Sequence, residues 1–409
     1  MFVIFLFAPL VAFLYSLRDL SKKKFAAIFI LFYGLFGYCQ HFELETSDIY
    51  RRGCWFESTD LAGDVFMMYS RGEIPDLYTA LTGLLIRSVT DNPKIYIGIL
   101  GLVFGILCYN FYKYIYQNWT RPKHGIFFLL IFLALTNISL TTFTGIRNAT
   151  ASMLFLCSAY RYIYCDKKLW IAGVLLSTLI HFQIWSVVAV FMIYILTPLF
   201  VSQRAVLFKV LLILAFILSL TNLSGRVNRF IEDNSDMVSN TSIVNKADVY
   251  TNGEEEELED GNTLYRQANQ LFFKSFSVIN RLGILVIMWL LINYMQKHRL
   301  DKPERRLYMF LLLLSVTVIA FYSINYHLGS RISNIWWELL YVFLARLFCL
   351  DGKIAAKKWL FFILFVNFAY IAQTFINAPR LVEPSFWLYP APLSIYTGLG
   401  FSIPNNPYI

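Results

Sequence analysis

The chain contains 409 residues, of which 58% are hydrophobic, 18% are aromatic and only 15% are charged. Soluble domains carry about a quarter charged residues, so this composition, with a mean hydropathy of +0.56, excludes an ordinary soluble protein. The net charge of +9 is the usual orientation signal of a membrane protein with basic cytoplasmic loops, so we expect no nucleic acid partner.

Apolar segments long enough to cross a bilayer as helices recur from one end of the chain to the other. A helix needs roughly 20 apolar residues to span the hydrocarbon layer. The candidate segments are 2–17, 25–40, 95–114, 124–140, 146–164, 168–183, 184–200, 205–222, 277–295, 307–326, 333–350 and 358–377. The pattern predicts an all-α polytopic membrane protein with about 12 transmembrane helices, forming a single domain over residues 1–409.

Lysine and arginine gather in alternate connections between these segments. The basic connections are 17–24, 113–123, 161–168, 204–209, 296–306 and 346–358. Because cytoplasmic loops carry the excess of lysine and arginine, we predict that these connections are cytoplasmic and that both termini lie outside.

Two longer connections are predicted on the outer side, and both contain more acidic than basic side chains. In the first, 41–94, the second half has apolar residues at helical spacing, which predicts an amphipathic helix over 76–90 that lies on the outer surface. The second, 223–276, is polar and rich in Asn, Ser and Glu, so we expect a mobile acidic linker.

Arg147 and His181 stand in two apolar segments that are joined by the short basic turn Cys165-Asp166-Lys167-Lys168. If that turn is cytoplasmic, Arg147 lies at the outer end of the first helix. His181 follows Lys168 by roughly 20 Å along the second helix, at 1.5 Å per residue. We therefore predict that both side chains lie near the outer surface on neighbouring antiparallel helices.

Other polar residues are expected at the same outer level: Asp48, Arg51, Arg281, His327 and Arg331, with Glu338 about two turns deeper. Any one of them could be an interfacial residue that snorkels toward water. Together they are unusual, because outer segments are normally depleted of arginine. Arginine binds phosphate through a planar fork and keeps its charge, so the set indicates an anionic lipid headgroup or a lipid-linked diphosphate.

Several common motifs are missing from the sequence. It contains no GxxxxGK[ST] phosphate loop, no CxxC and no HExxH, so we expect no cofactor and no metal site. Cys39 and Cys54 both fall near the outer surface, and the sequence leaves open whether they pair.

The segment from Thr142 to Trp185 resembles the signature of the EpsG-type exopolysaccharide polymerases, relatives of the Wzy-type O-antigen and capsule polymerases. The matching residues are Gly145, Ile146, Arg147, Ala149, Ala151 and His181, and weaker similarity covers Asp48, Tyr50, 75–78 and Arg331. The chain has Phe182-Gln183 where many relatives have a small hydroxyl residue.

The resemblance implies a GT-C-like, inverting-type glycosyltransferase in the bacterial cytoplasmic membrane, with its active site on the outer face and no metal. Its substrates would be undecaprenyl-diphosphate-linked oligosaccharide repeat units, and a flippase and a chain-length regulator of the same pathway are possible partners. The implied roles are diphosphate or substrate binding by Arg147, Arg281, Arg331, Arg51 and His327, and catalysis by His181, Asp48 and, less strongly, Glu338.

Two other classes of protein remain open at this point. A glycan ligase would use similar residues. A sugar O-acyltransferase should instead have a histidine deep in the membrane that faces a cytoplasmic thioester, and the sequence shows none. A flippase or transporter without chemistry would show internal symmetry and helices broken near the middle of the bilayer. The sequence shows neither feature clearly, and its polar residues gather at one face, which favours an enzyme.

Overall fold

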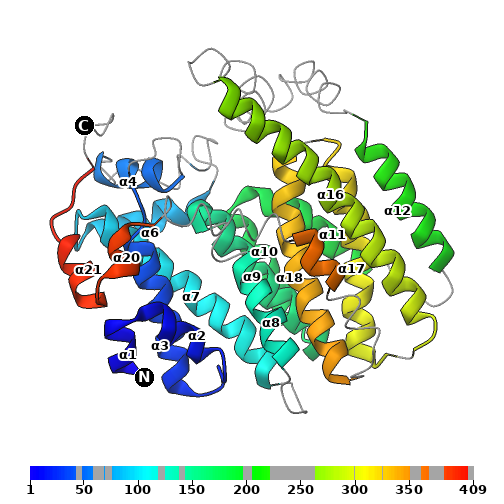
Figure 1. The fold of residues 1–409 in the computed structure, drawn as a ribbon, viewed down its shortest axis with the longest axis horizontal. Helices are drawn as coiled ribbons and strands as arrows, with labels where there is room; N and C mark the ends of the chain where they lie inside the picture. The colour runs from blue at the N-terminus through cyan, green and yellow to red at the C-terminus, as the bar shows by residue number, and fades with distance from the viewer. Residues whose placement is uncertain are drawn as a thin grey trace.

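The computed structural model describes residues 1–42, 48–58, 69, 76–117, 125–137, 143–196, 205–221, 263–298, 300–324, 326–350, 361–367 and 382–403. The regular elements within these residues are helices (Figure 1). A single isolated β-bridge in the same residues joins Gln40 to Val382. This all-helical architecture agrees with a polytopic membrane protein.

Most of the predicted apolar segments each form one helix. They are α3 (Lys23–Tyr38), α7 (Pro93–Gln117), α8 (Gly125–Leu135), α9 (Ile146–Cys165), α10 (Leu169–Ile180), α11 (Trp185–Leu196), α12 (Ala205–Ser219), α16 (Thr263–Met295), α17 (Lys302–Phe321) and α18 (Tyr326–Leu350). The short turn η3 (Phe182–Ile184) separates α10 from α11, and the last predicted segment, 358–377, is described only over 361–367, where it is helical.

Helix length and composition identify fewer spans than the sequence predicts. Among the described residues, Pro93–Gln117 and Ser277–Met295 are long and apolar enough to cross a membrane, while α8, α10, α11 and α12 are shorter apolar helices. The count of about 12 transmembrane helices and the orientation of the chain therefore stay predictions.

Two predicted elements differ from the structure. The segment 2–17 forms two short helices, α1 (Phe2–Phe7) and α2 (Pro9–Ser16), because Pro9 has no N–H and its ring blocks a continuous helix. The predicted linker 223–276 ends earlier than expected, since residues from Thr263 onward belong to α16. This stretch contains good helix formers such as Leu, Gln, Ala and Arg. Residues 222–262 lie outside the described residues.

Helices α3 and α7 pack backbone to backbone through glycines. A Cβ atom on Gly101 would lie 2.3 Å from the carbonyl oxygen of Tyr33, and one on Gly37 would lie 2.7 Å from that of Ile97. Such spacing is typical of membrane helix pairs, where small residues let backbones approach closely. The pair forms a rigid base for the N-terminal half of the protein.

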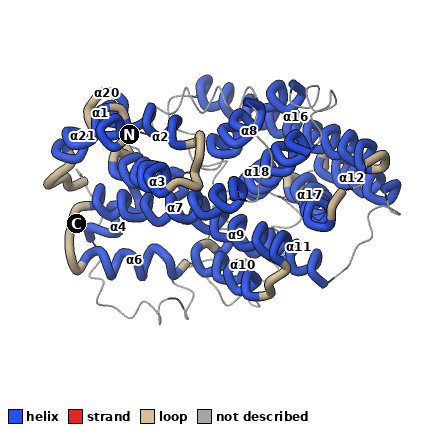
Figure 2. The backbone as a smooth tube through the Cα atoms, turned by 90° about the horizontal axis from the view of Figure 1, so that it is seen from below, coloured by secondary structure: helices blue, strands red, loops and turns tan. Residues whose placement is uncertain are grey.

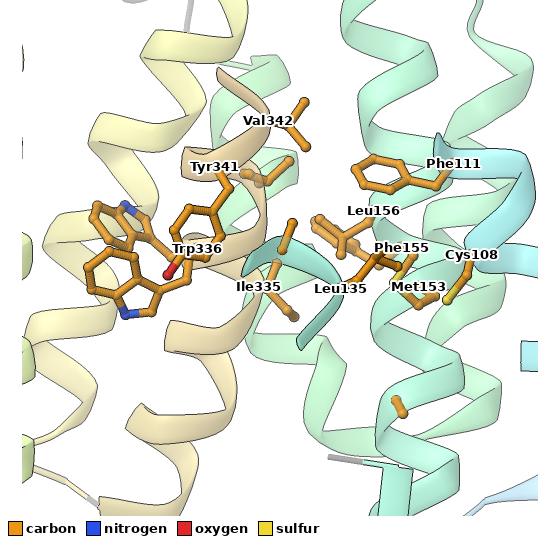
Figure 3. Packing of buried hydrophobic residues seen from close by; sticks show 14 of the residues in the cluster. Cys108, Phe111, Leu135, Met153, Phe155, Leu156, Ile335, Trp336, Tyr341 and Val342 are labelled. Atoms are coloured by element: carbon orange, nitrogen blue, oxygen red, sulfur yellow. The ribbon is translucent and has the colours of Figure 1, made fainter. Parts of the chain in front are cut away.

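Helix α18 packs against α8, α9 and α17. Buried apolar side chains of α7, α8, α9 and α18 pack in this part of the hydrophobic core (Figure 3). Ile335 and Trp336 of α18 are buried, as are Phe155 and Leu156 of α9. Other helices carry apolar residues on the outside. On α12, for example, Val206, Leu214 and Ile217 are exposed, as expected for a surface that faces lipid.

The basic connections lie together at one end of the bundle. Asp166, in the turn between α9 and α10, forms an ion pair with Arg306 just inside α17. Glu304 binds Arg346 of α18 at 2.8 Å, and the Tyr116 hydroxyl donates to the Leu17 carbonyl. The Tyr114 hydroxyl also contacts the Cys165 sulfur. Together these contacts bring five of the six predicted cytoplasmic connections to the same end.

The opposite end is covered by short helices. They are α4 (Asp48–Ser58), α6 (Leu77–Arg87), α20 (Pro384–Leu388) and α21 (Ala391–Thr397), which lie beside α3 and α7 in both views (Figures 1 and 2). Helix α6 lies within the segment 76–90, where the sequence predicts an amphipathic helix, and it exposes Leu85 while burying Ala80 and Ile86.

Candidate functional site

Arg147, in the first turn of α9, forms ion pairs with two aspartates from different parts of the chain. Its Nη2 lies 2.8 Å from Oδ1 of Asp48, and its Nε lies 3.4 Å from the other oxygen of the same carboxylate. Its Nη1 donates to Oδ2 of Asp76 at 2.6 Å. The planar guanidinium thus bridges α4 and the start of α6, as arginine does where two carboxylates must be fixed in relation to each other.

Asp76 is the central residue of this network. It occupies the N-cap position of α6, yet its side chain makes no capping bond to that helix, although capping is the common role of aspartate there. Its carboxylate accepts hydrogen bonds instead from Arg147, from the Phe182 backbone N–H at 2.9 Å and from Nδ1 of His181 at 3.2 Å. Asp76 therefore connects α6, α9 and the turn after α10.

His181 ends α10 with an extended backbone, at φ −152° and ψ 122°. Its Nε2 lies 3.1 Å from Oε1 of Gln183, and Nη1 of Arg331 donates to the same oxygen. Through Gln183 the network reaches the beginning of α18. We use the term outer network for Asp48, Asp76, Arg147, His181, Gln183 and Arg331.

Two opposing effects set the charge of the aspartates. Burial alone would raise the pKa of Asp48, but the positive charges of Arg147 and Arg52 outweigh it and hold that pKa below its ordinary value. Burial also raises the pKa of Asp76, and the hydrogen bond and charge of His181, together with Arg147, lower it to about 2. Both carboxylates are therefore ionised at neutral pH. Their stabilising effect is present above the ordinary aspartate pKa, and each effect is lost as the pH falls through the lowered pKa, which is about 2 for Asp76.

Arginines lie at the edge of the outer network. Arg52 is partly exposed, and its Nε lies 3.5 Å from Oδ1 of Asp48. Arg51, one residue earlier in α4, is exposed, and Arg331 is partly exposed. His327 is the second residue of α18, but its side chain lies outside the described residues.

Arg281, which the sequence grouped with these arginines, lies in a different polar cluster. Its Nη1 donates to the Ser219 carbonyl at the end of α12, and its Nε donates to the Ser277 carbonyl at 3.1 Å. Its guanidinium also lies 5.4 Å from the ring centre of Tyr322. In this position Arg281 joins α12, α16 and the end of α17, and its hydrogen-bond partners, Ser219 and Ser277, do not belong to the outer network.

Glu338 is fully buried in α18 and accepts a hydrogen bond from the Tyr112 hydroxyl of α7. It lies two turns after Arg331, as the sequence predicts, and its contacts are with α7 rather than with the outer network.

Sequence reasoning missed Asp76 and Gln183 as candidate site residues. The signal for Asp76 was available: it is the acidic residue of Pro75-Asp76-Leu77-Tyr78, a part of the resemblance, and it precedes a helix on the predicted outer side. We treated it as part of a helix start. Gln183 was noticed only as a departure from relatives.

The described residues contain no group of three or more His, Cys, Asp or Glu side chains that could hold a metal ion. Cys39 is a free thiol, so the bond to Cys54 that the sequence allowed is not formed in the structure.

Comparison with known protein families gives one clear result. The model of the EpsG family matches residues 64–390, which is most of the chain. The chain belongs to the EpsG family. This is the family of exopolysaccharide and Wzy-type polymerases, and membership indicates a polysaccharide polymerase associated with a membrane. No curated protein and no solved structure matches the chain.

The EpsG-family match covers most of the outer network. Asp76, Arg147, His181 and Arg331 lie inside the matched residues, whereas Asp48 lies before them. The resemblance seen in the sequence is therefore confirmed at the level of the family.

Proposed function

We propose that this EpsG-family protein is a glycosyltransferase that polymerises undecaprenyl-diphosphate-linked oligosaccharide repeat units at the outer face of the bacterial cytoplasmic membrane. The observation that carries the proposal is the outer network: a buried aspartate–histidine pair, Asp76 and His181, connected at both ends to arginines. A base beside fixed positive charge suits transfer of a sugar away from a diphosphate.

The partly exposed arginines are the proposed binding groups for the diphosphate. Arg51 and Arg52 approach from α4, and Arg331 approaches from α18. Each guanidinium can hold a phosphate through two parallel hydrogen bonds. Negative charge develops on the diphosphate as it leaves, and charges already in place stabilise that state without reorganisation. With arginines in this role the proposed reaction requires no metal.

Arg147 receives a different role from the one that the sequence suggested. Its relative exposure is 9%, and three of its nitrogens already donate to Asp48 and Asp76. We therefore assign it to positioning: it holds the two carboxylates, and through Asp76 the ring of His181. Arg281 and Glu338 take no part in this proposal, because their contacts are made elsewhere.

His181 is the proposed general base. Because ionised Asp76 can only accept, Nδ1 of His181 carries the proton of that hydrogen bond, and in the neutral ring Nε2 is an acceptor. Gln183, whose Oε1 lies 3.1 Å from Nε2, marks the side from which the acceptor hydroxyl of a sugar would donate to that nitrogen.

The proposed step balances without a co-reactant. The acceptor hydroxyl gives its proton to Nε2 of His181 while its oxygen bonds to the anomeric carbon of the donor sugar. The bond between that carbon and the diphosphate oxygen breaks, and the leaving undecaprenyl diphosphate keeps the electron pair. Asp76 stabilises the imidazolium that forms. The growing chain is then attached to the lipid carrier of the next unit.

The test uses a strain that lacks this protein and carries either the natural chain or His181→Ala. The natural chain should give long surface polysaccharide, and His181→Ala should give single repeat units at equal protein level on immunoblot. Loss of all surface glycan, including single units, would indicate a ligase, and repeat units trapped inside the cell would indicate a flippase. Normal polymer from His181→Ala would contradict the proposed role of the histidine.

A further inference from the structure

The C-terminal residues return to the outer end of the bundle and cross it. We call residues 382–403 the C-terminal strap. It begins beside the end of α3, where the Glu383 N–H donates to the Cys39 carbonyl at 2.8 Å and Val382 pairs with Gln40. The Glu383 carboxylate forms an ion pair with Lys94, whose side chain is buried at the start of α7.

The middle of the C-terminal strap is fixed to the same two helices. The Tyr38 hydroxyl donates to the Ile395 carbonyl at 2.7 Å, and the Asn92 side-chain amide donates to the Gly398 carbonyl at 2.9 Å. Nζ of Lys94 lies 4.4 Å from the ring centre of Phe401. These contacts are polar and directional, so they fix the register of the strap on α3 and α7.

The end of the C-terminal strap reaches α4. The Ile403 N–H donates to the Glu57 carboxylate at 2.9 Å. Ile403 is also packed against Gly53, because a Cβ atom there would lie 2.7 Å from its Cδ1. The ring of Phe401 packs at a tilt beside that of Phe42, with ring centres 5.5 Å apart, and Phe42 covers the same glycine.

Helix α4 is the element that brings Asp48 to Arg147. Its other side is held by the rest of the protein: Phe56 stacks on Tyr96 with ring centres 4.4 Å apart, and Nη1 of Arg87 donates to the Phe56 carbonyl. The strap therefore contacts a helix that already has a packed face, and its loss should shift α4 rather than unfold the protein.

The family match gives a second reason to connect these two segments. It covers residues 64–390, so α4 and the part of the strap that touches it both lie outside the matched region. Two segments at opposite ends of the sequence, both beyond the family's common region, thus pack on each other next to the outer network.

We infer that the C-terminal strap is a positioning element for the active site: it clamps α4 so that Asp48 stays in contact with Arg147. The inference rests on the proposed function for its effect on polymerisation, but the clamp itself is a separate structural claim. Phe401 and Ile403 are the positioning residues, and they act through α4 rather than by touching substrate.

The experiment measures the clamp and the activity separately in the full-length protein. Cys54 of α4 is fully buried, so its labelling by a maleimide in native membranes reports movement of α4. For this experiment the other five of the six cysteines are replaced by alanine, so that Cys54 is the single cysteine of every variant. The test variants are Phe401→Ala with Ile403→Ala, and independently Gly53→Leu. The control is Tyr396→Ala, which alters an exposed strap residue with a relative exposure of 72%.

Both test variants should expose Cys54 to labelling and lower polymer yield about ten- to hundredfold at normal protein level, as expected when a catalytic group is displaced by about 1 Å. The control should behave like the parent. The conservative pair Phe401→Tyr with Ile403→Leu should restore both readouts, which a general loss of folding would not.

Protected Cys54 in both test variants would overturn the inference, and so would exposed Cys54 with normal polymer. If the parent makes no polymer but the test variants still expose Cys54, the clamp on α4 is supported and the proposed function is contradicted.

Discussion

Two buried arginine–carboxylate clusters lie at opposite ends of the helix bundle, and their construction differs. At the basic end, Glu304 of α17 binds Arg346 of α18, so the pair joins two helices that already pack together. The outer network lies at the other end of α9, about 30 Å away for a helix of this length. It draws its side chains from α4, the start of α6, α9, the turn after α10, and α18.

Arginine and carboxylate side chains thus have two different roles at the two ends of the bundle. A buried ion pair between two helices that already pack together has a local, structural role. Apolar residues of the same volume can often replace such a pair without loss of stability. A network that gathers residues from segments far apart in the sequence, with arginines partly exposed at its edge, gives a fixed geometry for a ligand.

Asp76→Asn should have the largest effect. The amide keeps the shape of the side chain but loses the charge that fixes the proton on Nδ1 of His181 and holds Arg147. Loss of a carboxylate that orients a catalytic histidine lowers turnover by about 10⁴-fold in serine proteases, and we expect at least a thousandfold loss of polymer here. The readout is polymer on a gel against protein on an immunoblot.

The matched control for Asp76→Asn is Asp91→Asn. Asp91 follows α6 and forms an ion pair with Arg87, and its side chain is 81% exposed. The same chemical change there should leave polymer unaltered. If both substitutions give normal polymer, the central position of Asp76 has no functional meaning.

Arg147→Lys should have an intermediate effect. The charge is kept, but one ammonium group cannot reach two carboxylates with the geometry of the guanidinium fork. We expect polymer to fall roughly ten- to hundredfold, because Asp48 and the His181–Asp76 pair lose their common support. Arg305→Lys, at an exposed position of the basic end, is the control. Full activity of Arg147→Lys would show that a positive charge alone is sufficient.

Glu304→Gln should have the smallest effect on activity and a measurable effect on stability. The substitution removes a charged hydrogen bond to Arg346 in a buried position. We expect the free energy of unfolding to fall by about 1–3 kcal/mol, seen as a lower melting temperature of the purified protein. Polymer per folded molecule should not change. A large loss of polymer per molecule would remove the distinction between the two clusters.

Helices that follow from a regular hydrophobic pattern could be predicted from the sequence, whereas a helix break caused by one residue was missed. Helices such as α7, α9 and α18 follow from long apolar segments, because burial in lipid or in a core requires that pattern. The break at Pro9 was missed because the segment 2–17 was predicted from hydropathy alone, although a proline in the interior of a helix interrupts it.

The site was predictable where geometry depended on one helix hairpin. Arg147 and His181 could be placed together because a short turn between two helices fixes their relative height. Asp76 could not be placed in the same way, because its position depends on how α6 docks against α9 and α10, which is a tertiary contact without a local sequence pattern. Arg281 is the opposite case. The sequence places it with the arginines expected near the outer surface, but in the structure it joins α12 and α16 instead.

If the outer network is the catalytic site of a polymerase, purified protein in lipid nanodiscs should join repeat units on its own. Undecaprenyl-diphosphate-linked repeat units are added, and released undecaprenyl diphosphate and joined units are quantified together for the natural chain, Asp76→Asn and Glu304→Gln. We expect one released lipid for each new linkage with the natural chain and with Glu304→Gln, and almost none with Asp76→Asn. Equal turnover by Asp76→Asn, or joined units without released lipid, would show that the outer network is not that site.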